Sequence, residues 1–240
     1  HKFFFLFRYL PSMQSKMEVN LNKHYNALEE KIDGVFDAQQ DRSRQTRDSF
    51  IHSGIILLNQ VGFNDLKVGS LTSHSGRSVG SFYKRFSDKD AFFRALQSEA
   101  IARNTKVTEK RLGKKRLASL SPNGVLHELV DTLVDIFSSE TRGVLRESLL
   151  RILEPQDAWA PMRKSGQDIQ QRIVDRFQTF NMGNNELNTE RKVRFCYQVV
   201  VGVLQNDLIN NFHAISTKDQ SIGKALKAVV FDHMCSDSKY

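Results

Sequence analysis

The sequence predicts an all-α protein of about nine helices, in which an N-terminal three-helix unit precedes a C-terminal helical bundle. Two observations lead to this prediction. Apolar residues recur every three or four positions from Thr46 to the end of the chain, and no segment shows the alternating pattern of a strand. The chain has 240 residues, 40% of them apolar, which is enough for a sizeable core without disulfide bonds.

Helix boundaries follow from glycine, proline and capping residues. Gly62 and Gly76 are placed to end two short helices, and Ser78 and Ser87 are placed to begin the next two. Ser121 followed by Pro122 is typical of a helix start. The expected helices cover residues 46–61, 68–74, 78–86, 88–117, 122–137, 141–153, 162–180, 189–211 and 217–234.

We expect three segments with different roles. Residues 1–40 form an N-terminal extension, partly a translated leader or an artificial extension, in which residues 18–41 carry one amphipathic stripe interrupted by Gly34. Residues 41–93 form the three-helix unit, and residues 94–240 form the larger helical domain. The apolar run Phe3–Phe7 is broken by Arg8, so neither a secretory signal nor a membrane span is expected.

The positive charge of the chain is unevenly distributed. Residues 41–117 hold 16 Lys and Arg against 7 Asp and Glu, whereas the segments on either side are close to neutral. A basic block beside a neutral remainder is typical of polyanion binding, although a solvated basic face would have the same composition. Cys196 and Cys235 lack the spacing of a metal site, so we expect no metal or cofactor and a reducing, cytoplasmic location.

Two short helices joined by a turn that contains Gly76 predict a helix-turn-helix within the basic block. The motif residues are Thr46, Arg47, Gly62, Phe63, Leu71, Thr72, Gly76, Ser78, Gly80, Ser81, Phe82, Tyr83, Phe86, Lys89, Ala91, Phe92 and Phe93. Over residues 44–93 they resemble the DNA-binding domain of TetR-type transcriptional regulators. The resemblance implies binding to double-stranded DNA with a palindromic operator, by a homodimer.

The resemblance implies particular DNA contacts for the second short helix. Gly80 allows close approach, Ser81 is suited to a base edge, and Val79 is suited to a thymine methyl group. Tyr83 is placed to reach phosphates. The expected DNA-binding residues are Arg44, Thr46, Arg47, Arg77, Ser78, Val79, Gly80, Ser81, Tyr83, Lys84 and Lys89.

The sequence departs from the family pattern in the turn and at the helix starts. Lysine is common in the family where this chain has Val79, and a small apolar residue is usual where it has Arg77. Leu66 replaces the usual cap of the first short helix, so Asn64 or Asp65 is expected to cap it. The basic stretch 42–44 fits either an arm in the minor groove or a solvated tail.

The resemblance also implies a dimer formed by the last two long helices and an effector site in the middle of the helical domain. The expected dimerisation residues are Val200, Val203, Leu204, Leu226 and Val230. The expected pocket residues are Phe137, Leu150, Trp159, Met162, Phe177 and Tyr197, for which ordinary core packing is the alternative interpretation. A mixed lining of this kind favours an apolar or amphiphilic small molecule.

The function that follows is sequence-specific transcriptional regulation, as a repressor that a small molecule releases from its operator. A ligand-independent or architectural DNA-binding dimer is the alternative. No nucleophile elbow, zinc-protease motif or phosphate-binding glycine loop occurs, so the sequence does not favour an enzyme. An RNA-binding module is disfavoured because no strands are expected to carry aromatic platforms.

Overall fold

The computed structural model describes residues 41–153, 158–180, 186–210, 217 and 221–235. Every element within these ranges is a helix, and the predicted all-α class is confirmed. The expected amphipathic segment 18–41 lies outside the described residues except for Asp41. The helices are α2 (Asp41–Leu58), α3 (Val68–Ser75), α4 (Val79–Tyr83), α5 (Lys89–Leu112), α6 (Lys114–Ala118), α7 (Pro122–Ser138), α8 (Arg142–Leu150), α9 (Ala160–Gln178), α10 (Glu186–Asn210) and α11 (Ser221–Cys235).

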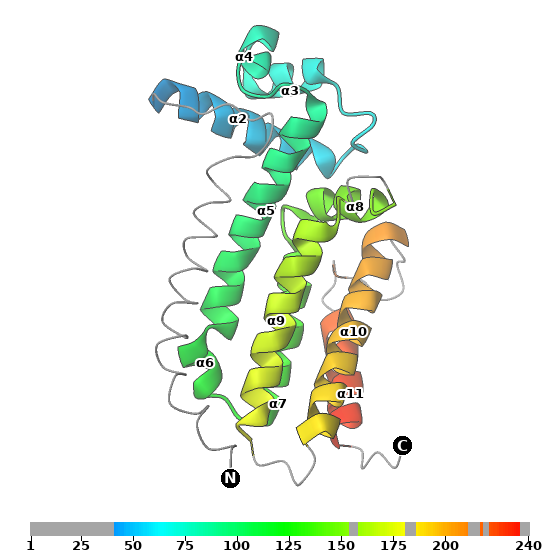
Figure 1. Ribbon diagram of the computed structural model, residues 1–240. Coiled ribbons are helices and arrows are strands. Elements are labelled where there is room, and N and C mark those ends of the chain that lie inside the picture. Colours follow the sequence, from blue (N-terminus) through cyan, green and yellow to red (C-terminus); the bar gives the residue numbers. More distant parts are fainter. Residues whose placement is uncertain (1–40, 154–157, 181–185, 211–216, 218–220, 236–240) are drawn as a thin grey trace, which may run out of the picture.

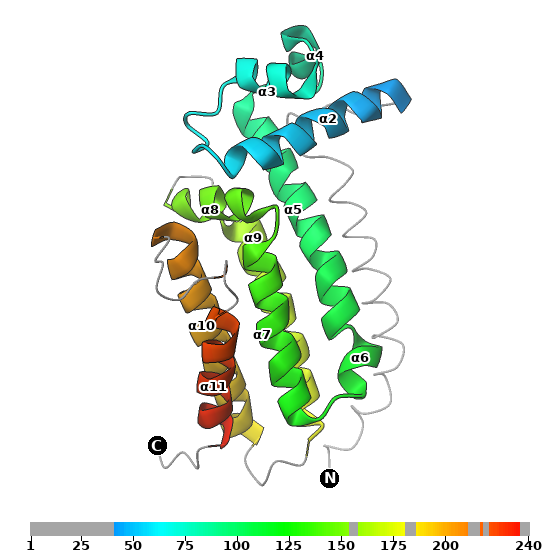
Figure 2. The same cartoon turned by 180° about the vertical axis from the view of Figure 1, so that it is seen from behind.

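The helices form an elongated molecule with the three-helix unit at one end. Figure 1 shows α2, α3 and α4 around one end of α5, which runs along the molecule to α6 at the opposite end. Helices α7 and α9 pack against α5, and α10 packs against α7 and α9. Figure 2 shows α11 on the rear side, against α7 and α10. Helix α8 lies across the end of this bundle, next to α2.

The helix-turn-helix forms because its turn contains glycine and its buried positions are aromatic. Gly76 adopts the left-handed conformation at φ 65°, and its amide donates a hydrogen bond to the carbonyl of Thr72. Such a φ angle favours glycine over any residue with a side chain. From their helical spacing, Phe63, Leu71, Phe82 and Phe86 are expected to form the small core that holds the short helices together, and all four are buried.

An aromatic cluster connects α2, α4 and α5. The ring of Phe82 lies 5.5 Å from that of Phe50 and 5.3 Å from that of Phe92, both in edge-on geometry. Helix α5 approaches α2 closely at Gly54, where a β-carbon would lie 2.6 Å from the ring of Phe92. The orientation of α4 therefore depends on packing against the helix that continues into the second domain.

The expected helix over residues 88–117 is two helices in the structure. Helix α5 ends at Leu112, and Gly113 has an extended backbone before α6 begins. A β-carbon at Gly113 would lie 2.3 Å from the carbonyl oxygen of Glu109, so a glycine is required at this break. Because of this break, the described residues contain ten helices where nine were expected.

The sequence predicts N-terminal caps for α5 and α7, and the structure confirms only the cap of α7. Ser121 caps α7 through the amide of Gly124, as predicted. The predicted cap Ser87 is wrong, because the carboxylate of Asp88 accepts the hydrogen bond from the amide of Ala91 at 2.7 Å. That backbone hydrogen bond holds the pKa of Asp88 below its ordinary value.

The predicted cap of α3 is also wrong. The residue at its N-cap is Lys67, whose side chain makes no capping hydrogen bond. Neither Asn64 nor Asp65 takes that position, because the turn before α3 closes through hydrogen bonds from Asp65 and Leu66 to the carbonyl of Gly62.

Candidate nucleic-acid interface

Helix α4 has one buried side and one exposed side. Phe82 points into the core, whereas Val79 and Tyr83 are 50% and 51% exposed. Ser78 caps the helix by accepting a hydrogen bond from the amide of Ser81 at 3.2 Å, and the two hydroxyl oxygens lie 3.0 Å apart. The exposed side therefore presents a valine, a tyrosine and a hydroxyl group that is held in place.

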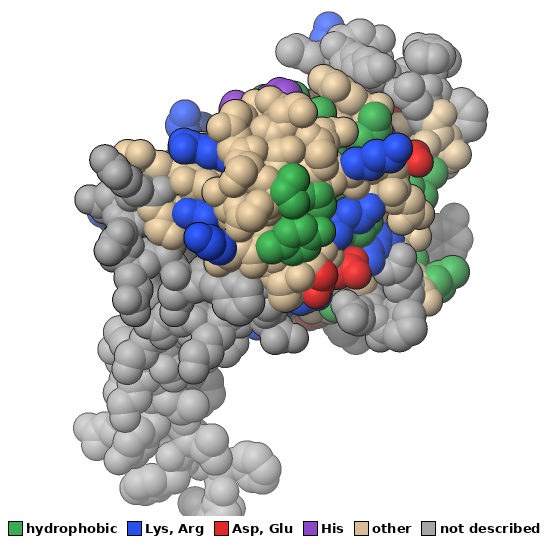
Figure 3. Space-filling model, turned by 90° about the horizontal axis from the view of Figure 1, so that it is seen from above, with side chains coloured by type: hydrophobic (Ala, Val, Ile, Leu, Met, Phe, Trp, Pro, Cys, Tyr) green, Lys and Arg blue, Asp and Glu red, His purple; other side chains and the backbone are tan. Residues whose placement is uncertain are grey.

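Around α4 the end of the molecule is largely uncharged. Figure 3 shows this end from above, with hydrophobic side chains near the centre, small polar groups and backbone around them, Lys and Arg side chains on two sides, and a few Asp and Glu side chains at one edge of the hydrophobic patch. This arrangement suits a DNA groove, because the centre can face base edges while the flanking cations face phosphates. A glycine at position 80 leaves open space where another residue would place a side chain.

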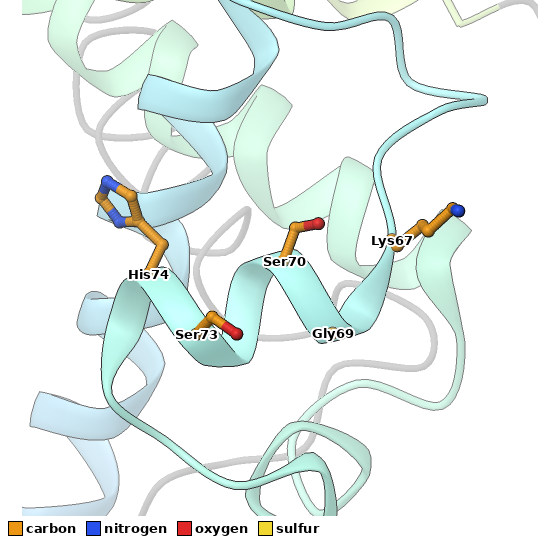
Figure 4. Close-up of a pocket in the computed structure, with 5 residues that line it drawn as sticks. All are labelled: Lys67, Gly69, Ser70, Ser73 and His74. Carbon is orange, nitrogen blue, oxygen red and sulfur yellow. The ribbon is translucent and has the colours of Figure 1, made fainter.

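Helix α3 adds a shallow depression beside this surface. Figure 4 shows its lining, in which Lys67 and His74 lie at the two ends of the helix and Gly69, Ser70 and Ser73 lie between them. The Nδ1 atom of His74 lies 3.0 Å from the hydroxyl of Ser53, which joins α3 to α2. Sequence reasoning did not single out this lining.

Arg85 positions helix α4, which would be the recognition helix of the helix-turn-helix, and sequence reasoning missed it. Its guanidinium donates to the carbonyl of Ser81 at 2.8 Å and to the carbonyl of Ser43 at 3.2 Å. Arg85 therefore joins the C-terminal end of α4 to the first turn of α2. Ser43 and Arg85 are 42 positions apart, so no local pattern indicates this role.

The expected DNA-binding residues differ in how exposed they are. Arg44, Arg77 and Lys84 are exposed, and Arg47 is half-buried. Thr46 lies within α2 and is only 8% exposed, which makes it less accessible than these residues, and its DNA contact stays a prediction. The side chain of Arg42, part of the predicted arm, lies outside the described residues.

Lys89 has a role within the protein. Its ammonium group donates to the carbonyls of Phe63 at 2.8 Å and Asn64 at 3.2 Å, and it lies 4.6 Å from the centre of the Phe63 ring. These contacts hold the loop after α2 against the start of α5. Lys89 therefore has a structural role in the free protein, and its phosphate contact stays a prediction.

The basic block is also only partly at the helix-turn-helix. Residues 41–93 hold eight Lys and Arg against five Asp and Glu, whereas residues 94–117 hold eight against two. The second group lies on α5 and α6, most of it toward the end farthest from α4. The charge distribution along the sequence therefore identified a basic segment that includes the helix-turn-helix. It overstated the positive charge of the helix-turn-helix itself, because half of the Lys and Arg residues lie on α5 and α6.

Helix α8 packs against the C-terminal end of α2 and is hydrogen-bonded to it. The carboxylate of Glu147 accepts a hydrogen bond from the amide of Phe63 at 3.0 Å, and the guanidinium of Arg146 donates to the carbonyl of Leu58 at 2.9 Å. The backbones touch at Gly143, where a β-carbon would lie 2.4 Å from the carbonyl oxygen of Leu58. We call these contacts the α8–α2 clasp. Through the clasp, the position of the three-helix unit depends on the helical domain.

The expected pocket residues do not line a single site. Phe137, Trp159, Met162 and Phe177 are buried members of the core, as the alternative interpretation held. Met162 and Phe177 are fifteen positions apart on α9, which corresponds to about 22 Å along the helix axis. Leu150 is 55% exposed, because it lies at the end of α8.

Tyr197 of that set is half-buried against α9, beside Gly166. Its burial raises the pKa of its phenol well above the ordinary value. The phenol is therefore a neutral group throughout the physiological range.

Four of the five expected dimerisation residues are buried within one chain. Val200 and Leu204 face the interior from α10, and Leu226 and Val230 do so from α11, so none of them is available to a second copy. The prediction was wrong for these four residues because their apolar sides face the bundle of their own chain. Helix α10 is apolar on more than one side, so the sequence did not show which side faces outward. Val203 is 41% exposed, and the outer surface of these helices also presents Phe195, Ile209 and Val229.

Neither a membrane span nor a metal cluster is found within the described ranges. No helix there is long and apolar enough to span a bilayer. No group of three or more His, Cys, Asp or Glu side chains gathers in those ranges in a way that would hold a metal ion.

The comparisons with known proteins agree with this architecture. The family described as "Bacterial regulatory proteins, tetR family" matches residues 50–96. A TetR transcription regulator from Haloarcula marismortui has 13% identity and a TM-score of 0.63, covering 80% of this chain and 97% of that chain. A TetR-like transcriptional regulator from Rhodococcus sp. RHA1 has 13% identity and a TM-score of 0.57, covering 84% and 100%.

NalD of Pseudomonas aeruginosa, the secondary repressor of the MexAB-OprM multidrug efflux pump, has 13% identity and a TM-score of 0.53, covering 83% of this chain and 100% of that chain. Among curated proteins, none matches the sequence significantly. At such low identities the solved structures support the fold, and the family rests on residues 50–96.

The fold and the exposed recognition helix define a helix-turn-helix DNA-binding protein with a second, all-helical domain. The match over residues 50–96 identifies this segment as a DNA-binding domain of the kind found in bacterial regulatory proteins of the TetR family. The matched family consists of regulatory proteins, which agrees with the expectation that the chain is not an enzyme.

Proposed function

We propose that the protein is a homodimeric, cytoplasmic repressor that binds a palindromic operator and leaves it when an apolar or amphiphilic small molecule binds the helical domain. Residues 41–93 would bind DNA, and residues 94–240 would bind the effector and the second copy. Repression is supported by the fold shared with NalD, whose description names it a repressor. The α8–α2 clasp is the observation that carries the regulatory part of the proposal.

The clasp supports regulation because it is polar and directional as well as close. Its hydrogen bonds connect α8 to backbone groups at the end of α2, so a shift of α8 moves α2 or breaks them. A dimer places two recognition helices at a defined separation on DNA, and a small displacement of each unit changes that separation. A ligand that binds the displaced form better lowers the affinity for the operator.

The dimer proposal rests on the outer surface of α10 and α11. Phe195, Val203 and Val229 are large apolar side chains that remain exposed in one chain, and the Phe195 ring lies 4.7 Å from the ring of His233 on α11. A second copy covering this surface would remove these side chains from water. The two-fold axis of such a dimer matches a palindromic operator.

The proposal is tested by selecting duplexes from a randomised DNA pool at physiological salt and sequencing those that bind. A palindromic consensus supports a dimeric, sequence-specific regulator. A panel of small molecules is then scored for release of that duplex and for thermal stabilisation of the free protein. A consensus without any effector would favour the ligand-independent dimer, and the absence of a consensus would contradict the proposal.

A further inference from the structure

The DNA-facing helices lack the side chains that usually read guanine and adenine. Within α3 and α4 there is no Arg, Lys, Asn or Gln. These are the side chains that form paired hydrogen bonds with G and A in the major groove. Two of the outward positions carry no side chain, since at Gly69 and Gly80 a β-carbon would meet nothing within 4 Å.

Val79 is the side chain that protrudes from this surface at the start of α4. Half of it is exposed, and the core does not explain it, because Phe82 supplies the buried side of the helix. The N-terminal residues of a recognition helix contact base edges. The one apolar group on a base edge in the major groove is the C5-methyl group of thymine.

The neighbouring hydroxyls leave Val79 room to make such a contact. Ser78 is occupied as the helix cap, accepting from the amide of Ser81 and lying 3.0 Å from its hydroxyl. Gly80 adds no side chain beside the valine. The valine methyl groups can therefore reach the floor of the groove without displacing a polar contact.

We propose that Val79 is a specificity-determining residue that selects a thymine in each operator half-site by packing against its C5-methyl group. This inference rests on the proposed function, since it takes the exposed side of α4 as the surface that reads DNA. The preferred half-site then contains a thymine at the base pair under the first turn of α4. Lys67 and Lys84 face the phosphates on either side and contribute affinity without sequence preference.

The contact can be tested by removing only the C5-methyl group of the thymine. The consensus duplex selected from a randomised pool is resynthesised with deoxyuridine in place of each thymine in turn, in both half-sites, and affinities are measured at fixed salt. We expect one position at which the replacement weakens binding about fourfold per half-site, as for the loss of one buried methyl group. In Val79→Ala the same replacement should have almost no effect.

Lys84→Gln is the matched control, because Lys84 lies at the opposite end of the same helix and its replacement should keep the full preference for thymine over deoxyuridine. Val79 is exposed, so Val79→Ala should fold normally, which circular dichroism checks. A consensus without an invariant thymine, or an equal deoxyuridine penalty in the parent and Val79→Ala proteins, would overturn the inference while leaving the proposed function in place. No consensus at all would overturn both.

Discussion

The carboxylate of Glu147 in α8 accepts a hydrogen bond from the backbone amide of Phe63, which follows α2, at 3.0 Å. Glu147 is only 6% exposed, and its second oxygen lies 3.0 Å from the guanidinium of Arg146. A buried carboxylate is costly unless it is paired and hydrogen-bonded, and here it has both kinds of partner. This pair of residues therefore joins α8 to the segment that follows α2.

Replacing Glu147 with alanine should destabilise the protein, because the amide of Phe63 would remain buried without an acceptor. The expected loss is about 1–3 kcal/mol in the free energy of unfolding, measured with urea. The control is Glu109→Ala, which removes an exposed ion pair with Arg172 and should cost less than about 1 kcal/mol. Equal losses in the two variants would contradict the importance of the clasp.

Gly143→Ala tests the close approach of α8 to α2. A β-carbon there would lie 2.4 Å from a backbone oxygen of Leu58, and backbone atoms cannot move aside as a flexible side chain can. We expect a destabilisation of roughly 1–3 kcal/mol. The matched control, Gly69→Ala in α3, meets open space and should stabilise the helix by about 0.5–1 kcal/mol. Tolerance of alanine at position 143 would show that the two helices can separate without cost.

Lys84 and Arg85 are adjacent but should affect DNA binding differently. Lys84→Gln should reduce the slope of log K against log salt by about 1 for each phosphate that the lysine no longer neutralises, hence about 2 for a dimer. Arg85→Ala should lower affinity with little change in slope, because Arg85 holds α4 to Ser43 and does not contact phosphate. The measurement is a salt titration of operator affinity. Equal changes of slope would show that both residues contact phosphate.

The sequence predicted the parts of the fold that depend on local patterns. The turn at Gly76 and the start at Pro122 follow from backbone preferences of single residues, and the scaffold of Phe82 and Phe86 follows from helical spacing. The break at Gly113 could not be distinguished from a glycine tolerated within a helix. The need for glycine there comes from the close approach of Gly113 to the carbonyl of Glu109, which depends on the actual backbone path.

The candidate site was predicted less completely, because its supporting contacts join distant residues. Arg85 with Ser43 and Glu147 with Phe63 are pairs that no spacing rule connects. Lys89 was assigned to DNA from the family pattern, whereas its ammonium group lies against the carbonyl of Phe63. A sequence shows which residues are cationic or apolar, and only the packed chain shows which of them are already occupied.

The two cysteines should differ in reactivity. Burial raises the pKa of the Cys196 thiol to about 11, whereas Cys235 is exposed. Because the thiolate is the reactive form, a maleimide at about pH 8 should label Cys235 quickly and Cys196 only after unfolding in urea. Mass spectrometry of the labelled peptides measures this. Labelling of both thiols at similar rates in the native protein would contradict the burial of Cys196.

The raised pKa of Cys196 also predicts that the stability of the protein depends on pH. The folded state favours the neutral thiol of Cys196, so the unfolded chain loses that proton at lower pH than the folded chain does. The free energy of unfolding should therefore be unaffected below about pH 8 and should fall between the ordinary pKa of a thiol and about 11. In Cys196→Ala this part of the decline should be absent, which urea titrations at about pH 8 and about pH 10 would show.

The position of α10 leads to opposite expectations for Val200 and Val203, which lie three residues apart. Val200 is fully buried in its own chain, so Val200→Asp would bury an unpaired charge and should cost roughly 3–5 kcal/mol in stability. Val203 is 41% exposed on the surface proposed to contact the second copy, so Val203→Asp should leave the fold intact and yield a monomer. Sedimentation equilibrium measures the association state, and circular dichroism measures the fold. A folded dimer of Val203→Asp would place the dimer interface on another surface, because a charge on each copy at a two-fold contact would be repelled and desolvated together.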